Sequence, residues 1–379
     1  MYIMKIAILE SIVMPAGHEV EFDRILVNEL KRQGHTPVFF VPEKFPFKVD
    51  YQAEIDYLDG GEVVTYAGAG RLKRLWLSML REKRRIAWFN SAYEKAVNGE
   101  CDAIVVPTAT FRYIRTLRNS KLLHSPIPVY MIFHGINPKE QPRFEKQARA
   151  VLENKNIHLK VITLRDDFAN SGLSNVDLIA PPVFTPTHIS YDKNIVLHNP
   201  LRLGFFGQYR KEKNIEFFID AFLRARFAIP VILTVQGATA KPEDSEAFEK
   251  IMEKYSGYQN IVFLHKNLIG SEWEKALLEQ DAIMMPYAAE RYRYHWGAML
   301  FTSLGFWKPV LVSPELNPEV LEHYKVGKAV TMHTVEELAS QLESFVQDVS
   351  EHKESYIRGF EMANNDFSHE KLIRNIIGY

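Results

Sequence analysis

The sequence predicts an α/β protein made of two doubly wound halves. Short apolar runs alternate with segments of helical periodicity along nearly the whole chain. This alternation is interrupted by one proline-bearing region, residues 180–200, and then restarts. A length of 379 residues is also too great for one ordinary hydrophobic core. Because helical crossovers connect parallel strands, we expect a parallel sheet in each half.

The first half opens with a strand–helix–strand unit. Lys5–Leu9 is an apolar run that we expect as a buried strand, and Val20–Arg32 carries apolar residues at helical spacing. Gly34 ends this helix, and Thr36–Val41 is the next strand. The further strands expected in this half are Ala103–Val106, Val129–Phe133 and Lys160–Thr163.

The second half repeats the pattern. Leu201–Phe206 is expected as a strand, and a basic loop leads from it into a helix over Ile215–Arg226. The other expected strands are Val231–Gln236, Ile261–Leu264, Ala282–Met285 and Pro309–Val312. The other expected helices are Glu246–Lys254, Glu272–Glu279, Gly297–Gly305 and, after a loop at residues 364–367, Ser368–Ile377. We therefore expect a first domain over 1–185, a linker over 186–200, a second domain over 201–362 and a C-terminal helical segment over 363–379, with a ligand cleft between the carboxyl ends of the two sheets.

Composition excludes several classes of protein. The net charge of −1 gives no general attraction to nucleic acid, and one cysteine cannot form an internal disulfide or a cysteine-based zinc site. No apolar run approaches the roughly 20 residues of a membrane span, and the apolar N-terminus is too short for a signal peptide. Phosphate-loop, dinucleotide, nucleophile-elbow and Asp-x-Asp motifs are all absent from the sequence. We therefore expect a cytoplasmic protein that is soluble or at most peripheral, with no metal ion and no bound cofactor.

The strongest local signal follows the strand Leu201–Phe206. Gly207 would let the backbone approach a ligand closely, and two cations come after it. Arg210 could bind a diphosphate as a planar fork, and Lys213 could bind it as a point charge. The alternative is a solvated basic turn between a strand and a helix.

Two further segments follow expected strands. The loop over residues 286–298 contains Glu290, which could bind sugar hydroxyls, and Gly297, where a helix N-terminus could receive phosphate oxygens. His134 directly follows a strand of the first half and could hold a sugar or carry a proton. The alternatives are an aromatic surface loop and a packed histidine.

These segments together resemble the GT-B fold glycosyltransferases, and glycosyltransferase family 4 (the group 1 glycosyltransferases) in particular. Lys213 keeps the position of the family's diphosphate-binding lysine, whereas Gln208 stands where the family has an arginine. Residues 286–290 resemble the family's Pro-Ser-x-x-Glu motif, so Glu290 matches the first of two paired acids. The second acid falls at Ala298 or Thr302, and neither is acidic.

The resemblance implies two Rossmann-like domains that face a cleft, a last helix that returns to the first domain, and transfer of a sugar from a nucleoside diphosphate sugar to a hydroxyl. It implies His134 and Glu290 as catalytic residues. The implied diphosphate-binding residues are Gly207, Arg210 and Lys213. The implied donor sugar or nucleotide contacts are Gly17, Gln208, Arg293, His295, Gly297 and Thr302. The acceptor would be a saccharide or a lipid-linked saccharide of bacterial surface polysaccharide assembly, with Glu10, Glu19 and His18 as candidate bases.

The segment Arg71–Arg85 is basic and carries an apolar stripe at helical spacing, formed by Leu72, Leu75, Trp76, Met79 and Leu80. One interpretation is a helix that lies on the anionic inner face of a membrane. The other is a stripe that packs on the protein core, and we expect this one because such stripes usually face a core.

Three other functions stay open for a chain of this kind. A nucleotide-sugar 2-epimerase has the same architecture but needs paired carboxylates, which the missing second acid disfavours. A two-domain solute-binding protein is usually exported, and no signal peptide is found. A non-catalytic relative of the transferases would serve as a scaffold.

Overall fold

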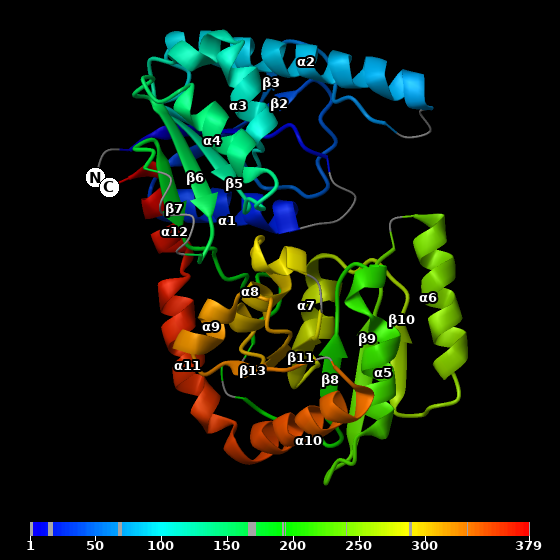
Figure 1. The fold of residues 1–379 in the computed structure, drawn as a ribbon. Helices are drawn as coiled ribbons and strands as arrows, with labels where there is room; N and C mark the ends of the chain where they lie inside the picture. Colours follow the sequence, from blue (N-terminus) through cyan, green and yellow to red (C-terminus); the bar gives the residue numbers. More distant parts are fainter. Residues whose placement is uncertain are drawn as a thin grey trace. The chain divides into compact units, whose positions relative to one another are not determined.

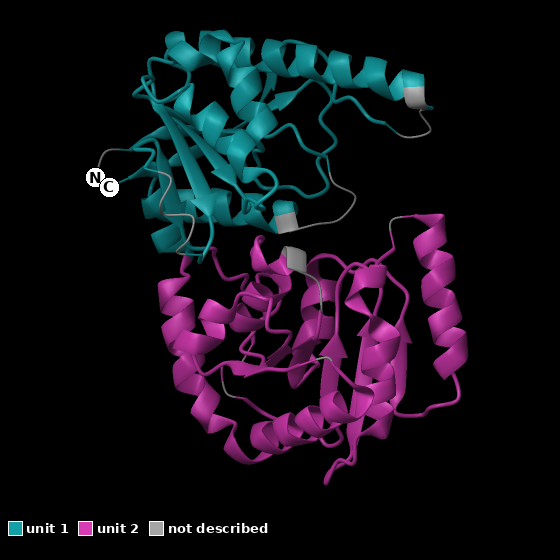
Figure 2. Ribbon diagram, viewed as in Figure 1, with its two compact units in different colours: residues 1–180, 369–379 teal, residues 181–368 magenta. Residues whose placement is uncertain are grey.

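The computed structural model describes residues 3–13, 18–66, 70–165, 172–191, 193, 195–239, 241–287, 290–331 and 333–378 (Figure 1). The chain divides into two compact units, one formed by residues 1–180 and 369–379 and the other by residues 181–368 (Figure 2). The division after residue 180 means that the segment 181–200, which includes the expected linker, groups with the second unit.

The described part of the first unit contains a seven-stranded parallel sheet with the strand order β3-β2-β1-β4-β5-β6-β7. Its strands are β1 (Lys5–Leu9), β2 (Thr36–Pro42), β3 (Glu54–Leu58), β4 (Ala103–Val106), β5 (Val129–Phe133), β6 (Ile157–Ile162) and β7 (Val176–Ile179). Its helices are α1 (His18–Arg32), α2 (Arg71–Val97), α3 (Phe111–Arg118), α4 (Gln141–Arg149) and α12 (His369–Ile377). The chain winds outward from β1 through β2 to β3 and then crosses to β4 on the other side of β1, so the topological switch point lies between β1 and β4.

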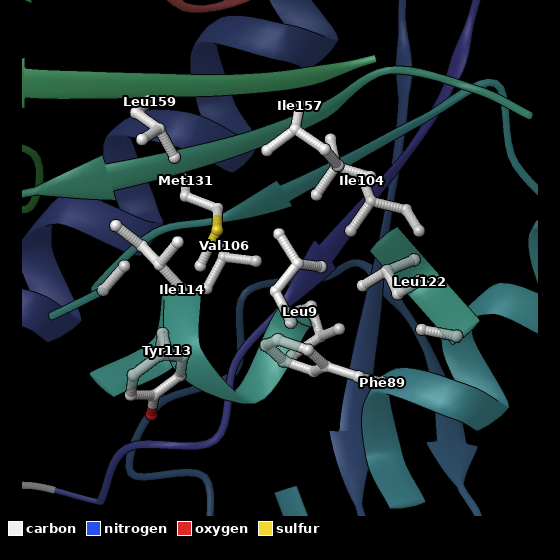
Figure 3. Close-up of a cluster of buried hydrophobic side chains, with 14 of the residues drawn as sticks. Leu9, Phe89, Ile104, Val106, Tyr113, Ile114, Leu122, Met131, Ile157 and Leu159 are labelled. Atoms are coloured by element: carbon white, nitrogen blue, oxygen red, sulfur yellow. The ribbon is translucent and has the colours of Figure 1, made fainter. Parts of the chain in front are cut away.

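The core of the first unit lies between the sheet and the helices on each face. On one face Leu9, Val106 and Met131 pack with Phe89 of α2 and Ile114 of α3 (Figure 3). Both faces of the sheet are covered, which explains why its central strands read as continuous apolar runs. On the other face α1 packs against α12 (Figure 1).

The C-terminal helix α12 is held in the first unit by polar contacts as well. The side chain of Arg32 donates to Glu370 at 2.8 Å, and the hydroxyl of Tyr130 on β5 donates to the carbonyl of Ile377 at 3.1 Å. The last helix therefore completes a unit whose other residues end at position 180.

The described part of the second unit contains a six-stranded parallel sheet with the order β10-β9-β8-β11-β12-β13. Its strands are β8 (Leu201–Phe205), β9 (Val231–Gln236), β10 (Ile261–Leu264), β11 (Ala282–Met285), β12 (Val310–Val312) and β13 (Gly327–Ala329). Its helices are α5 (Ile215–Arg224), α6 (Pro242–Tyr255), α7 (Gly270–Leu278), α8 (Ala298–Gly305), α9 (Pro318–His323), α10 (Val335–His352) and α11 (Glu354–Asp366). The switch point of this sheet lies between β8 and β11.

Two buried carboxylates fix the segment before β8 to the second unit. Glu274 of α7 accepts hydrogen bonds from the backbone N–H groups of residues 187–189 and from the side chains of Thr187 and His188. Asp281 accepts from the backbone and ring of His198 and from the backbone of Arg202. The expected linker is therefore anchored along much of its length.

The predicted loop at residues 364–367 is wrong for its first three residues, which belong to α11. The side-chain amide of Asn364 donates to the carbonyls of Leu304 and Phe360, each at 2.9 Å. A contact with α8 thus stabilises helix where two asparagines and an aspartate favour a turn.

The expectation that the apolar stripe of residues 71–85 packs on the core is also wrong. The side chains of Leu72, Leu75, Trp76 and Met79 are 60–83% exposed. A helix of 27 residues is roughly 40 Å long. The buried apolar side chains of α2 all belong to its C-terminal half; they are Trp88, Phe89, Ala92 and Ala96. Within the described residues no helix has both the length and the apolar content to cross a bilayer.

Candidate functional site

The predicted diphosphate-binding residues gather at the carboxyl end of β8, beside the switch point of the second sheet. Gly207 has φ = +112°, a conformation that side chains disfavour. A 3-10 helix over Lys211–Lys213 follows, and Asn214 in the left-handed conformation joins it to α5. This compact turn brings Lys213 back to Gly207: a Cβ added at Gly207 would lie 3.1 Å from the Lys213 ammonium.

The ammonium of Lys213 lies in an aromatic environment. Its Nζ is 4.5 Å from the ring centroid of Tyr287 and 5.9 Å from that of Phe205. The residue is only 6% exposed. Cation–π contacts of this kind partly replace the water that a buried ammonium loses. The charge is held in a low-dielectric setting, where its attraction for an anion is strengthened.

Gln208 and Arg210 lie beside this turn. The guanidinium of Arg210 donates to the side-chain carbonyl of Gln208 at 3.0 Å, and Arg210 is half-buried whereas Gln208 is exposed. The two side chains are thus joined beside the turn. Gln236, at the end of β9, accepts the backbone N–H of Gly207 at 2.8 Å and fixes the turn from the neighbouring strand.

Sequence reasoning gave no role to the residues that support this turn. Tyr287 follows β11, and its hydroxyl donates to the carbonyl of Phe206 at 3.2 Å. Ser313 follows β12, and its hydroxyl donates to the carbonyl of Tyr287 at 2.8 Å. Tyr287 and Ser313 lie within two residues of the ends of β11 and β12, and Gln236 ends β9. This position at the ends of neighbouring parallel strands is the signal that could have identified them.

The loop after Tyr287 is described in part. The side chain of Glu290 lies outside the described residues, so its predicted catalytic role stays a prediction. Arg293 forms an ion pair with Glu319 of α9, and His295 is half-buried. A pocket of about 320 Å³ opens next to this region. It is lined by Val312, Ser313, Pro314, Pro318, Leu321, Glu322, Gly327 and Ala329.

Two predicted donor contacts are engaged within the protein. The backbone N–H of Gly297, expected to be open to phosphate, donates to the side chain of Asn317 at 2.8 Å. Thr302 is 7% exposed, and its hydroxyl donates to the carbonyl of Ala298 one turn earlier in α8. The N–H of Gly297 itself is therefore engaged by Asn317, and the predicted contacts of Gly297 and Thr302 with the donor stay predictions.

His134, the predicted catalytic histidine of the first unit, lies after β5. Its Nε2 donates to the carbonyl of Pro107 at 2.8 Å, since a carbonyl can only accept. Its ring contacts Phe22 of α1 edge-on, with 4.7 Å between centroids. Gly17, the predicted donor contact in the first loop, lies outside the described residues.

A buried polar cluster lies at the switch point of the first sheet. Glu10 follows β1 and is 3% exposed. Its Oε1 accepts the N–H groups of Ser11 and Ile12, and no described residue hydrogen-bonds its Oε2. Burial raises the pKa of Glu10 to about 8. The hydroxyls of Ser11 and Tyr113 lie 3.0 Å apart, and so extend the cluster to α3.

Asp23 of α1 belongs to the same cluster. It is 5% exposed, and no described residue hydrogen-bonds its Oδ1. Burial, followed by the charges of Glu10 and Glu19, raises its pKa well above the ordinary value. Among the described residues, no set of three or more His, Cys, Asp or Glu side chains is arranged to hold a metal ion.

Comparison with known proteins gives one family match. Residues 200–348 match the family model for group 1 glycosyl transferases, and this range covers the turn at Gly207, Lys213 and the loop after Tyr287. No curated protein matches the chain by sequence.

Solved structures match over nearly the whole chain. HepE of Anabaena, in complex with UDP, shares 15% identity at a TM-score of 0.65, with 98% of each chain covered. A glycosyltransferase from Rickettsia africae has 12% identity and a TM-score of 0.67, covering 98% of this chain and 96% of its own. The lipopolysaccharide outer core galactosyltransferase WaaB has 13% identity and a TM-score of 0.61, covering 98% and 99%. These similarities confirm the expected fold of two Rossmann-like domains.

Proposed function

We propose that the protein is a glycosyltransferase that moves a sugar from a nucleoside diphosphate sugar to a hydroxyl of a saccharide or lipid-linked saccharide. The match of residues 200–348 to the family model for group 1 glycosyl transferases supports this proposal. The first donor to consider is UDP-glucose, because the structurally similar HepE binds UDP, glucose and UDP-glucose. The epimerase alternative is not favoured, since the family match is to transferases.

The observation that carries the proposal is the buried ammonium of Lys213 at the switch point of the second sheet. In open α/β sheets, ligands bind at the carboxyl ends of the strands beside such a point. The leaving diphosphate gains negative charge as the sugar departs, and a preorganised cation in a dry site stabilises that charge strongly. Lys213 and Arg210 would supply this stabilisation in place of a metal ion, and the backbone of Gly207 would let the diphosphate come close.

The remaining predicted donor contacts are part of the same proposal. Glu290 and His134 would bind the sugar, with Gly17, Gln208 and His295 as further donor contacts. Arg293 would serve only if the diphosphate replaced Glu319 as its partner. Thr302 and the N–H of Gly297 would need to leave their present hydrogen bonds.

For the acceptor, Glu10 is the candidate base that the structure supports best. Glu10 lies at the switch point of the first sheet, the usual ligand site of such sheets. No described residue hydrogen-bonds its Oε2. In the transfer, the acceptor oxygen bonds to the anomeric carbon, the bond from that carbon to the diphosphate oxygen breaks, and the acceptor proton passes to the Glu10 carboxylate. A base whose pKa lies near the working pH is effective at this step.

The place of action that fits a lipid-linked acceptor is the cytoplasmic face of a membrane, in the assembly of bacterial surface polysaccharide. This location belongs to the proposal and is tested separately from the donor site.

A thermal-shift panel with UDP, GDP, ADP, CMP and TDP is the first test. A ligand that binds the folded state alone raises its stability, so one base should stand out. Transfer of labelled sugar from the matching donor to a saccharide acceptor is the second test. The proposal fails if no diphosphate raises the melting temperature and no labelled product forms.

A further inference from the structure

We propose that the N-terminal half of α2 is a docking face for an anionic lipid bilayer. The docking face consists of the apolar side chains Leu72, Leu75, Trp76 and Met79, with Lys73 and Lys83 beside them. This inference extends the proposed membrane location and rests on residues of the first unit outside the proposed donor site.

The four apolar side chains form one continuous stripe. Successive residues of an α-helix are rotated by about 100°, so positions 72, 75, 76 and 79 share one side of α2. Their exposed fractions are 83%, 63%, 60% and 74%. Isolated exposed apolar residues are ordinary, but a contiguous group of this size marks an interaction surface.

The side of α2 that faces its own unit is fixed by other residues. The guanidinium of Arg81 stacks over the ring of Tyr66 at 4.7 Å, and that of Arg84 donates to the carbonyl of Glu62. The indole N–H of Trp88 donates to the carbonyl of Gly61 at 2.9 Å. These contacts set the rotation of the helix, so the stripe is held outward.

The charges around the stripe identify its occupant as an anionic surface. Lys73, Arg74 and Lys83 are all exposed, and the sequence contains no acidic residue between Leu72 and Arg81. A second copy of the chain on this face would bring like charges together. An anionic bilayer accepts leucine, tryptophan and methionine among its acyl chains, and its headgroups attract the lysines and arginine.

The test is co-sedimentation of the full-length protein with vesicles of neutral phosphatidylcholine, or of phosphatidylcholine mixed with phosphatidylglycerol. We expect binding to the mixed vesicles that is at least about tenfold tighter than to neutral ones, and that weakens as salt is added. The double substitution Leu75→Ser and Trp76→Ser should abolish this binding. Ile269→Ser is the matched control, because Ile269 is as exposed as Leu75 (63%) but lies in the second unit.

Three results would overturn the docking face. These are equal binding to both kinds of vesicle, unchanged binding by the double variant, and a dimer in solution that the double variant loses, which would assign the face to a second copy. Thermal shift with UDP, measured on the same proteins, keeps the two proposals apart. If the double variant loses vesicle binding but keeps its thermal shift with UDP, the docking face is supported and the donor site is untouched. If the unsubstituted protein shows no thermal shift with UDP, only the donor-site proposal is contradicted.

Discussion

Replacing Lys213 with methionine tests the donor site most directly. Methionine keeps much of the length and apolar contact of the lysine stem but removes the ammonium that lies over Tyr287. A hydrogen bond from a charged group contributes about 1.5–3 kcal/mol, so nucleoside diphosphate affinity should fall roughly 10- to 150-fold. The lost cation–π contact lowers stability and the removal of a buried charge raises it, so stability is measured separately from affinity.

Isothermal titration with UDP measures the affinity, and urea unfolding measures the stability. Lys211→Met is the matched control, since Lys211 lies two residues earlier in the same turn and is exposed. An exposed charge contributes little, so its variant should bind UDP almost as tightly as the unsubstituted protein. Equal affinities for the two variants would refute the reasoning and locate the diphosphate elsewhere.

Three further substitutions test the surrounding structure. Gly207→Ala forces a side chain into φ = +112° and against the Lys213 ammonium. It should cost roughly 1–3 kcal/mol by urea unfolding, and no cost would mean that the turn readjusts freely. Glu274→Ala removes the acceptor of residues 187–189 and should cost about 1–3 kcal/mol at neutral pH. Desolvation opposes ionisation of Glu274, but hydrogen bonds from Thr187 and His188 outweigh it and lower the pKa of Glu274 below its usual 4.5. The difference in unfolding free energy between the variant and the unsubstituted protein should therefore shrink as the pH falls below 4.5. A difference that stays constant would contradict this account. Glu10→Gln should reduce kcat strongly yet raise the melting temperature, by an amount that grows as the pH rises from about 4.5 to about 8, because burial raises the pKa of Glu10 from 4.5 to about 8 and the unfolded chain loses its proton first. Unchanged kcat would leave Glu10 a structural residue.

The fold could be predicted from the sequence because central parallel strands are buried on both faces and therefore form continuous apolar runs. The apolar runs Lys5–Leu9 and Ala282–Met285 were predicted with their observed bounds for this reason. Three edge strands, β3, β7 and β13, were missed, since Glu54–Leu58, Val176–Ile179 and Gly327–Ala329 are short and largely uncovered. Burial on one face or none leaves too weak a hydrophobic pattern to recognise.

The candidate site could be predicted from the sequence only where one short segment contains its residues. Gly207, Arg210 and Lys213 lie within seven residues, and the structure brings them together in one turn. Asn317, which takes the N–H of Gly297, lies twenty residues away on another loop, and no local pattern announces such a partner. The exposure of Trp76 was missed for a similar reason, because periodicity reports that a stripe exists and not what covers it.

The return of α12 to the first unit has a consequence for the order of events during synthesis. The second unit is one continuous segment, residues 181–368, and is complete before the final eleven residues, 369–379, are made. The first unit, by contrast, lacks the helix that covers α1 until residues 369–377 have been made. Domains usually fold in the order in which they are synthesised, but here the earlier unit needs residues that follow the whole of the second unit. Removal of residues 369–379 would therefore destabilise the first unit, although these residues follow the second unit in the sequence.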